Sequence, residues 1–231
     1  MDMFGAVVRF FQDGGEFMYP ILIVFAIGMA IAIERYLYLT YSGASNRQLW
    51  NKIVPYLKAG NFQKAVELTS KSKAAIGTIL TYGLYRIRSA RRRDDIEKAM
   101  EESMMEVLPR LEQRTHYLAT LANIATLLGL LGTIIGLIRA FTAVANANPA
   151  EKADMLSASI SVAMNTTAFG LMVAIPLLLI HTVLQTKTNK IVDSLEMASV
   201  KFLNAITERE GKGARSEEHT SELQSPSATS Y

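Results

Sequence analysis

Hydroxyl and amide side chains gather in the first half of a long uncharged run between residues 155 and 185. Six of the eleven residues from 157 to 167 are polar: Ser157, Ser159, Ser161, Asn165, Thr166 and Thr167. The residues that follow, up to position 180, are almost pure hydrocarbon. An amide inside a membrane is costly unless it finds hydrogen-bond partners. The cluster therefore either forms hydrogen bonds between helices or lines a hydrated ion path, and the pattern leaves both open.

The three longest apolar runs contain no Asp, Glu or Lys, and these runs are 17–33, 117–138 and 155–185. His181, near the end of the third run, is the one titratable group that the sequence places at membrane depth. If this protein moves protons through the membrane, a carboxylate must therefore come from another subunit. That inference leads to the partner prediction below.

The second run carries a stripe of small residues at helical spacing, with Thr133 beside it. The stripe consists of Ala122, Ala125, Gly129, Gly132, Gly136 and Ala140. Small residues let helix backbones approach closely in lipid, so plain helix packing is the preferred interpretation of the glycines. A lone Thr in a membrane helix usually bonds to a carbonyl one turn earlier, so Thr133 by itself is weak evidence for an ion path.

The composition excludes several other classes of site. The chain has no cysteine and only three histidines, which are far apart, so disulfides, thiolate chemistry and a metal centre are not expected. A net charge of +3 does not suggest nucleic-acid binding. No nucleophile–base set or phosphate loop appears, so we predict no enzyme and no cofactor.

The run lengths predict an all-α integral membrane protein with three transmembrane helices, two of them extended as long cytoplasmic helices. The expected segments are an interfacial amphipathic helix (1–15), the first span (16–40), a cytoplasmic helical region (41–115), the second span (116–141), a periplasmic loop (142–154), the third span (155–185), a cytoplasmic C-terminal helix (186–210) and a disordered tail (211–231), whose composition differs from the rest of the chain and leaves a non-native origin open. Lys and Arg concentrate in 41–115 and after 185, which predicts a periplasmic N-terminus. The acidic residues before the first span and the lack of a cleavage site favour a retained span over a signal peptide.

Local signals refine the helices of the cytoplasmic region. Asn61 is a candidate N-cap for a helix over 62–70, and a second helix is expected over 78–89. Asp94 is a candidate cap for a third helix that runs into the second span, with Pro109 as a kink rather than an end. After the third span, apolar residues from Ile191 to Ala205 recur at steps of four and three, which predicts a packing stripe.

The motifs, taken in order, resemble the ExbB/TolQ branch of the MotA/TolQ/ExbB ion-channel family, over about residues 1–210. The first span ends in Ala32-Ile33-Glu34-Arg35-Tyr36-Leu37, similar to the family's glutamate–arginine exit. The second span holds Leu128-Gly129-Leu130-Leu131-Gly132-Thr133-Ile134-Ile135-Gly136-Leu137, close to the family's glycine–threonine–glycine span. The third holds Thr166-Thr167-Ala168-Phe169-Gly170-Leu171 and Val173-Ala174-Ile175-Pro176, similar to the threonine–glycine–proline span.

This resemblance implies a homopentamer in the bacterial inner membrane around two copies of a single-span subunit like ExbD, TolR or MotB. The partner's membrane aspartate would carry the ion, and the flow of H⁺ or Na⁺ would rotate the pentamer and deliver work to the cell envelope. Thr133 and Thr167 match the family threonines that face the partner, and we group Thr166 and Asn165 with them as pore-lining. Gly129, Gly132, Gly136, Gly170 and Pro176 are assigned to helix packing or a hinge.

Two features bear on the identity of the ion. ExbB and TolQ proteins usually carry a glutamate where this chain has Val162, which puts a proton relay through this subunit's own carboxylate in doubt. The pair Thr166-Thr167 resembles sodium-driven stator subunits, and hydroxyls are suitable Na⁺ ligands. We therefore lean to sodium held at Thr133, Thr166 and Thr167, with H⁺ as the alternative.

A different class of function stays open from the sequence. The chain could be a passive scaffold subunit of an envelope complex, which would need no pore. Half of a solute transporter is disfavoured because no internal repeat or binding residue at membrane depth is seen. The sequence does not distinguish nutrient uptake, envelope maintenance and motility, nor the direction of rotation.

Overall fold

The computed structural model describes Phe10 and residues 14–87, 92–145 and 148–224, with side chains described up to residue 208. Every regular element within these residues is a helix, which confirms the predicted all-α class. The helices are α2 (Met18–Ala59), α3 (Phe62–Ser70), α4 (Ala75–Ile87), α5 (Arg93–Glu112), α6 (Thr115–Ala145) and α7 (Lys152–Gln224). The interfacial helix predicted for 1–15 falls mostly outside the described residues.

Three helical stretches of the described chain are long and apolar enough to cross a membrane, as predicted: Met18–Ala59, Arg93–Ala145 and Lys152–Glu208. Their outward faces carry large apolar side chains, since Ile23, Leu127 and Leu179 are each about three-fifths exposed in the single chain. Exposed apolar surface of this extent suits lipid or other membrane helices rather than water.

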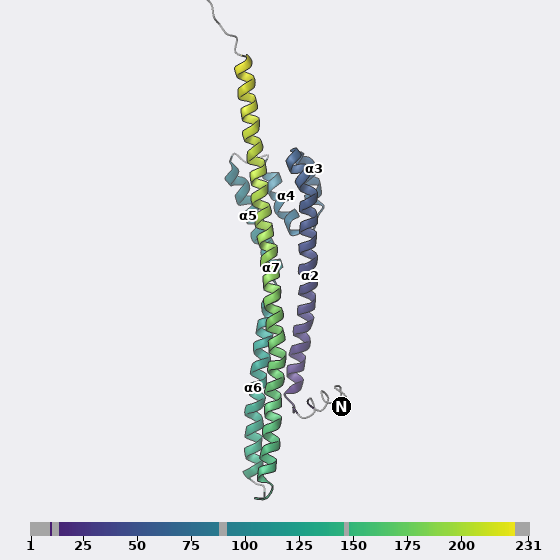
Figure 1. The fold of residues 1–231 in the computed structure, drawn as a ribbon, viewed down its shortest axis with the longest axis vertical. Coiled ribbons are helices and arrows are strands. Elements are labelled where there is room, and N and C mark those ends of the chain that lie inside the picture. The colour runs from purple at the N-terminus through teal and green to yellow at the C-terminus, as the bar shows by residue number, and fades with distance from the viewer. Residues whose placement is uncertain (1–9, 11–13, 88–91, 146–147, 225–231) are drawn as a thin grey trace, which may run out of the picture. The chain divides into compact units, whose positions relative to one another are not determined.

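The chain forms two compact units. The first consists of Met1–Tyr38 and Glu112–Lys187, and it holds the start of α2, all of α6 and the first part of α7 (Figure 1). Close approaches join these helices, because a Cβ added at Gly28 would lie 2.8 Å from Leu177 and one added at Gly136 would lie 3.0 Å from Ala163. This unit contains every candidate pathway residue.

The second unit consists of Leu39–Leu111 and Thr188–Tyr231. Gly77 on α4 lies against Leu49 of α2, and Gly83 lies against Met100 of α5 and Phe202 of α7. The predicted stripe after the third span is buried in this core at Ile191, Leu195, Ala198 and Phe202. The bond from Arg93 Nη2 to Asn204 Oδ1 (3.0 Å) ties α5 to α7.

Two predicted helix starts have different outcomes. Asn61 caps α3 as expected, since its Oδ1 accepts the backbone N–H of Lys64 at 3.1 Å. The assignment of Asp94 as the cap of α5 was wrong, because α5 begins at Arg93 and leaves Asp94 in its first turn. Asp95 accepts the backbone N–H of Arg92 at 3.3 Å, so this carboxylate reaches back from inside the helix to the residue before it.

Helix ends differ from the expected boundaries at three places. The helix of the first span continues past residue 40 to Ala59, because Leu49, Ile53 and Leu57 recur at steps of four and are buried. We expected one continuous helix before the second span, with a kink at Pro109. The structure instead has a break after Glu112, where Arg114 adopts φ 66°. Helix α7 runs on to Gln224, into the segment 211–231, and the disorder expected there stays a prediction.

Candidate ion-pathway site

Glycines bring α6 and α7 together at the level of the candidate threonines. A Cβ added at Gly129 would lie 3.3 Å from the backbone of Thr166, Thr167 and Gly170. A Cβ added at Gly170 would lie only 2.7 Å from the carbonyl oxygen of Ala125. A side chain at either position would force the helices apart, so these glycines set the distance between Thr133 and Thr167.

The hydroxyls of Thr133 and Thr167 meet across this contact, with 3.0 Å between their Oγ1 atoms. Thr133 Oγ1 lies 2.7 Å from the carbonyl oxygen of Leu130 and 3.3 Å from that of Gly129. Thr167 Oγ1 lies 3.0 Å from the same Gly129 oxygen. Both side chains are half-buried, so one side of the pair remains accessible in the single chain. The structure thus brings together two residues that lie 34 positions apart in sequence.

The chemistry of this hydroxyl pair follows from its hydrogen count. Each hydroxyl has one hydrogen to donate and two lone pairs. When both hydrogens point at backbone carbonyls, the two oxygens face one another with lone pairs only. Such a pair can coordinate a small cation or accept a hydrogen bond from a protonated carboxylic acid. It cannot supply a negative charge of its own.

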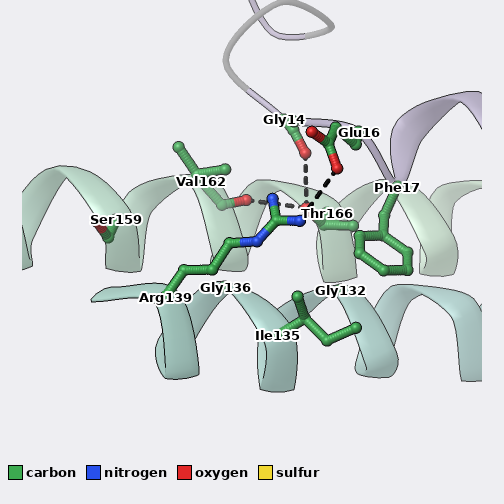
Figure 2. A pocket seen from close by; sticks show the side chains of 11 residues that line it. Gly14, Glu16, Phe17, Gly132, Ile135, Gly136, Arg139, Ser159, Val162 and Thr166 are labelled. Atoms are coloured by element: carbon green, nitrogen blue, oxygen red, sulfur yellow. Dashed lines mark hydrogen bonds and ion pairs between the residues drawn. The ribbon is translucent and has the colours of Figure 1, made fainter. Parts of the chain in front are cut away.

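Thr166 and Thr167 do not form a pair of neighbouring ligands. The Thr166 side chain is buried, and its Oγ1 lies 2.7 Å from the carbonyl oxygen of Gly14 and 3.0 Å from that of Val162 (Figure 2). The hydroxyl that the sequence analysis grouped with the ion ligands therefore points to the segment before α2. Asn165, which precedes Thr166 in α7, is half-buried.

The segment before α2 forms a wall that sequence reasoning missed. With α6 and α7 it borders an open pocket of about 150 Å³, lined by Gly14, Gly15, Glu16, Phe17, Gly132, Ile135, Gly136, Arg139, Ser159, Val162 and Thr166 (Figure 2). Arg139 Nη2 lies 3.2 Å from Glu16 Oε2, and both side chains are more than half exposed. The sequence signal for this wall is the Gly14-Gly15 pair followed by Glu16.

The remaining predicted residues lie nearby. Gly132 contacts the Thr166 methyl group, and Gly136 contacts Ala163, so both glycines lie against α7. Pro176 lies inside α7, which continues through it. Val162, at the position of the family's usual glutamate, is partly exposed and lines the pocket. Among the described side chains, no group of three or more His, Asp or Glu is arranged to hold a metal ion.

Comparison with known proteins decides the family. The sequence pattern of the MotA/TolQ/ExbB proton channel family matches residues 71–197, which is more than half of the chain. The chain belongs to this family. The matched region includes α6 with Thr133 and the part of α7 that carries Thr166 and Thr167.

Individual relatives agree with this assignment. The chain is 29% identical to an ExbB homolog of Methanothermobacter thermautotrophicus over 202 residues, 85% of this chain and 69% of the relative. It is 30% identical to an ExbB-like protein of Synechocystis over 177 residues, 75% and 68% of the two chains. It is 35% identical to the Tol-Pal system protein TolQ of Haemophilus influenzae over 94 residues, 41% of each chain.

The family and the three apolar helices together establish a multi-pass protein of the inner membrane, as predicted. The chain is a member of this membrane proton-channel family, which supplies subunits of energy-transducing complexes. This is a family of channel and transport proteins rather than a class of enzymes.

Proposed function

We propose that this chain is the channel-forming subunit of an ion-driven motor and that the transported cation passes the Thr133–Thr167 pair. The observation that carries the proposal is the position of these hydroxyls, 3.0 Å apart between the apolar runs 117–138 and 155–185, which contain no Asp or Glu. Oxygens that can bind a cation are present at membrane depth, whereas the countercharge that a cation needs there is missing.

A partner must therefore supply the charge. We propose that five copies of this chain surround two copies of a single-span subunit like ExbD, TolR or MotB, whose membrane aspartate receives the ion. The exposed apolar side chains of α6 and α7, such as Leu127 and Leu171, support packing against further helices. The half-buried Asn165 is proposed to face this assembly.

Ion flow is proposed to rotate the pentamer around the partner, with the N-terminus of each chain in the periplasm, so that work reaches the cell envelope. The topology is open to a direct test because the chain has no cysteine. Single cysteines at Glu16 and at Lys58 should react from opposite sides of sealed inner-membrane vesicles. Labelling of both positions from the same side would contradict the topology.

The cation is H⁺ or Na⁺. Val162 in place of a glutamate and the hydroxyl pair at Thr133 and Thr167 support sodium, while Thr166 adds less support than expected because it bonds to Gly14. Transport output should be measured with sodium replaced by potassium at a fixed proton gradient. Loss of output supports sodium, and unchanged output assigns the proton.

The subunit composition can be tested independently of transport. The complex should be purified from native membranes in a mild detergent and its mass measured by native mass spectrometry. A mass of five copies of this chain with two copies of an acidic single-span protein supports the motor. A chain that purifies with lipid alone in its centre would instead support the passive scaffold, which also predicts that Thr133→Ala with Thr167→Ala leaves function intact.

A further inference from the structure

We infer that Thr166 is a positioning residue, which clasps the segment before α2 and thereby orients Thr167 toward Thr133. We call the hydrogen bond from the Thr166 hydroxyl to the Gly14 carbonyl the clasp. The inference depends on the proposed function only in the experiment that measures ion transport. It assigns to Thr166 a task other than ion binding. It also gives the residues before the first span a task in the pathway.

The first support is the burial and reach of the contact. Thr166 is 2% exposed, and its hydroxyl joins a carbonyl 152 positions earlier in the sequence at 2.7 Å. The Gly14 backbone is also buried. A buried carbonyl needs a donor, and Thr166 provides one from α7.

The second support is that the surrounding residues are shaped for this contact (Figure 2). Gly15 adopts φ +74°, which favours glycine and turns the chain toward α2. A Cβ at Gly15 would lie 3.2 Å from Cγ1 of Val162. On the other side, the lack of a side chain at Gly132 makes room for the Thr166 methyl group.

Two further contacts hold the same segment. Glu16 pairs with Arg139 on α6 at 3.2 Å, and the ring of Phe10 lies edge-on to that of Phe169 on α7 with 6.3 Å between centroids. The segment therefore contacts both helices that carry the hydroxyl pair. The exposed ion pair adds little energy, which leaves the buried hydrogen bond as the principal polar contact.

Helix geometry links the clasp to the pathway. Successive residues of an α-helix are rotated by about 100° around its axis. When Thr166 points at Gly14, its neighbour Thr167 is turned toward Gly129 and Thr133, as the 3.0 Å contacts show. Loss of the clasp removes one restraint on the rotation of α7. The distance between the Thr133 and Thr167 hydroxyls then varies over a wider range.

The clasp can be tested without any transport assay. Met18 is fully buried, and Gly14 lies directly on its side chain, so the segment must open to expose it. In the cysteine-free chain, Met18→Cys should react with a water-soluble maleimide at a rate set by that opening. Thr166→Val should raise the rate about fivefold, the effect of losing one buried hydrogen bond, whereas Thr166→Ser should leave it within about twofold.

The matched control is Ile79→Cys, which is equally buried but belongs to the second unit. Its labelling should not respond to Thr166→Val. Equal labelling of Met18→Cys in the Thr and Val backgrounds would overturn the clasp. A parallel rise at Ile79→Cys would also overturn it, since the substitution would then loosen the whole protein.

A second experiment separates positioning from ion binding. In the Thr166→Val background, a short bis-methanethiosulfonate reagent should join Glu16→Cys to Arg139→Cys through disulfides, hold the segment against α6 and restore cation flux in the native complex, and reduction should abolish the rescue. A verified cross-link without rescue would show that the hydroxyl itself is needed, which contradicts a positioning task. If the wild-type complex carries no flux, the proposed function fails, while the labelling result still decides the clasp.

Discussion

Gly170→Ala tests how closely the α6–α7 contact sets the hydroxyl pair. The new Cβ would lie 2.7 Å from the Ala125 carbonyl oxygen, whereas ordinary contact begins at 3.4 Å, so the helices must separate by about 0.7 Å. A separation of that size would lengthen the 3.0 Å contact between Thr133 and Thr167 to about 3.7 Å, beyond hydrogen-bond reach.

The energetic cost has two opposing parts. Overpacking against backbone that cannot move aside costs about 1–3 kcal/mol. Replacing a helical glycine by alanine gains about 1 kcal/mol in helix propensity. Gly43→Ala is the matched control. Its Cβ would lie 3.7 Å from the Ile191 side chain, an ordinary contact, so this variant gains the helix-propensity energy without an overpacking cost.

The assay compares the unfolding of both variants in detergent with cation flux through the native complex. We expect Gly170→Ala to be less stable than Gly43→Ala by about 1–3 kcal/mol and to lose most of its flux. Gly43→Ala should keep full flux. Equal stability of the two variants, or full flux in Gly170→Ala, would refute the argument that this contact positions the hydroxyls.

Three further predictions concern regions away from the pathway. Asn46→Ala should cost about 1–3 kcal/mol, because its buried Oδ1 accepts the Ile76 backbone N–H at 3.1 Å, and hydrogen exchange at the start of α4 should rise accordingly. Hydrogen bonds from Lys64 and a second lysine lower the pKa of Glu67 to about 2, so its stabilisation is complete above pH 4.5 and is lost as the pH falls toward 2. A thermal unfolding series should show a flatter slope for Glu67→Gln within that window, and an unchanged slope would contradict the pairing. Arg114→Gly should raise the free energy of unfolding by about 0–1 kcal/mol, because relief of the left-handed backbone exceeds the loss of an exposed ion pair, whereas Arg114→Ala should lower it.

Much of the fold could be predicted from local sequence signals. The spans follow from long uncharged runs, and the start of α3 follows from Asn61, since each signal acts within a few residues. The end of α5 was missed because its cause is the backbone conformation of Arg114, a residue type that gives no warning of positive φ. The extension of α2 to Ala59 depends on burial of its last turns in the second unit.

The pathway residues were predicted less evenly. Thr133 and Thr167 came from the family resemblance, and the structure places their hydroxyls together. Thr166 was grouped with them because the pair Thr166-Thr167 resembles sodium-driven stator subunits, yet adjacent helical residues point in different directions. Its partner Gly14 could not be predicted because a backbone carbonyl leaves no signature in the sequence.

The most direct test of the central claim measures cation flux in liposomes. The complex reconstituted there carries Thr133→Val together with Thr167→Val. Valine keeps the shape of threonine and removes both oxygens, while Thr133→Ser with Thr167→Ser keeps them. The account predicts that the valine pair abolishes flux in an assembled complex and that the serine pair retains it. Wild-type flux in the valine pair would contradict a pathway past these hydroxyls.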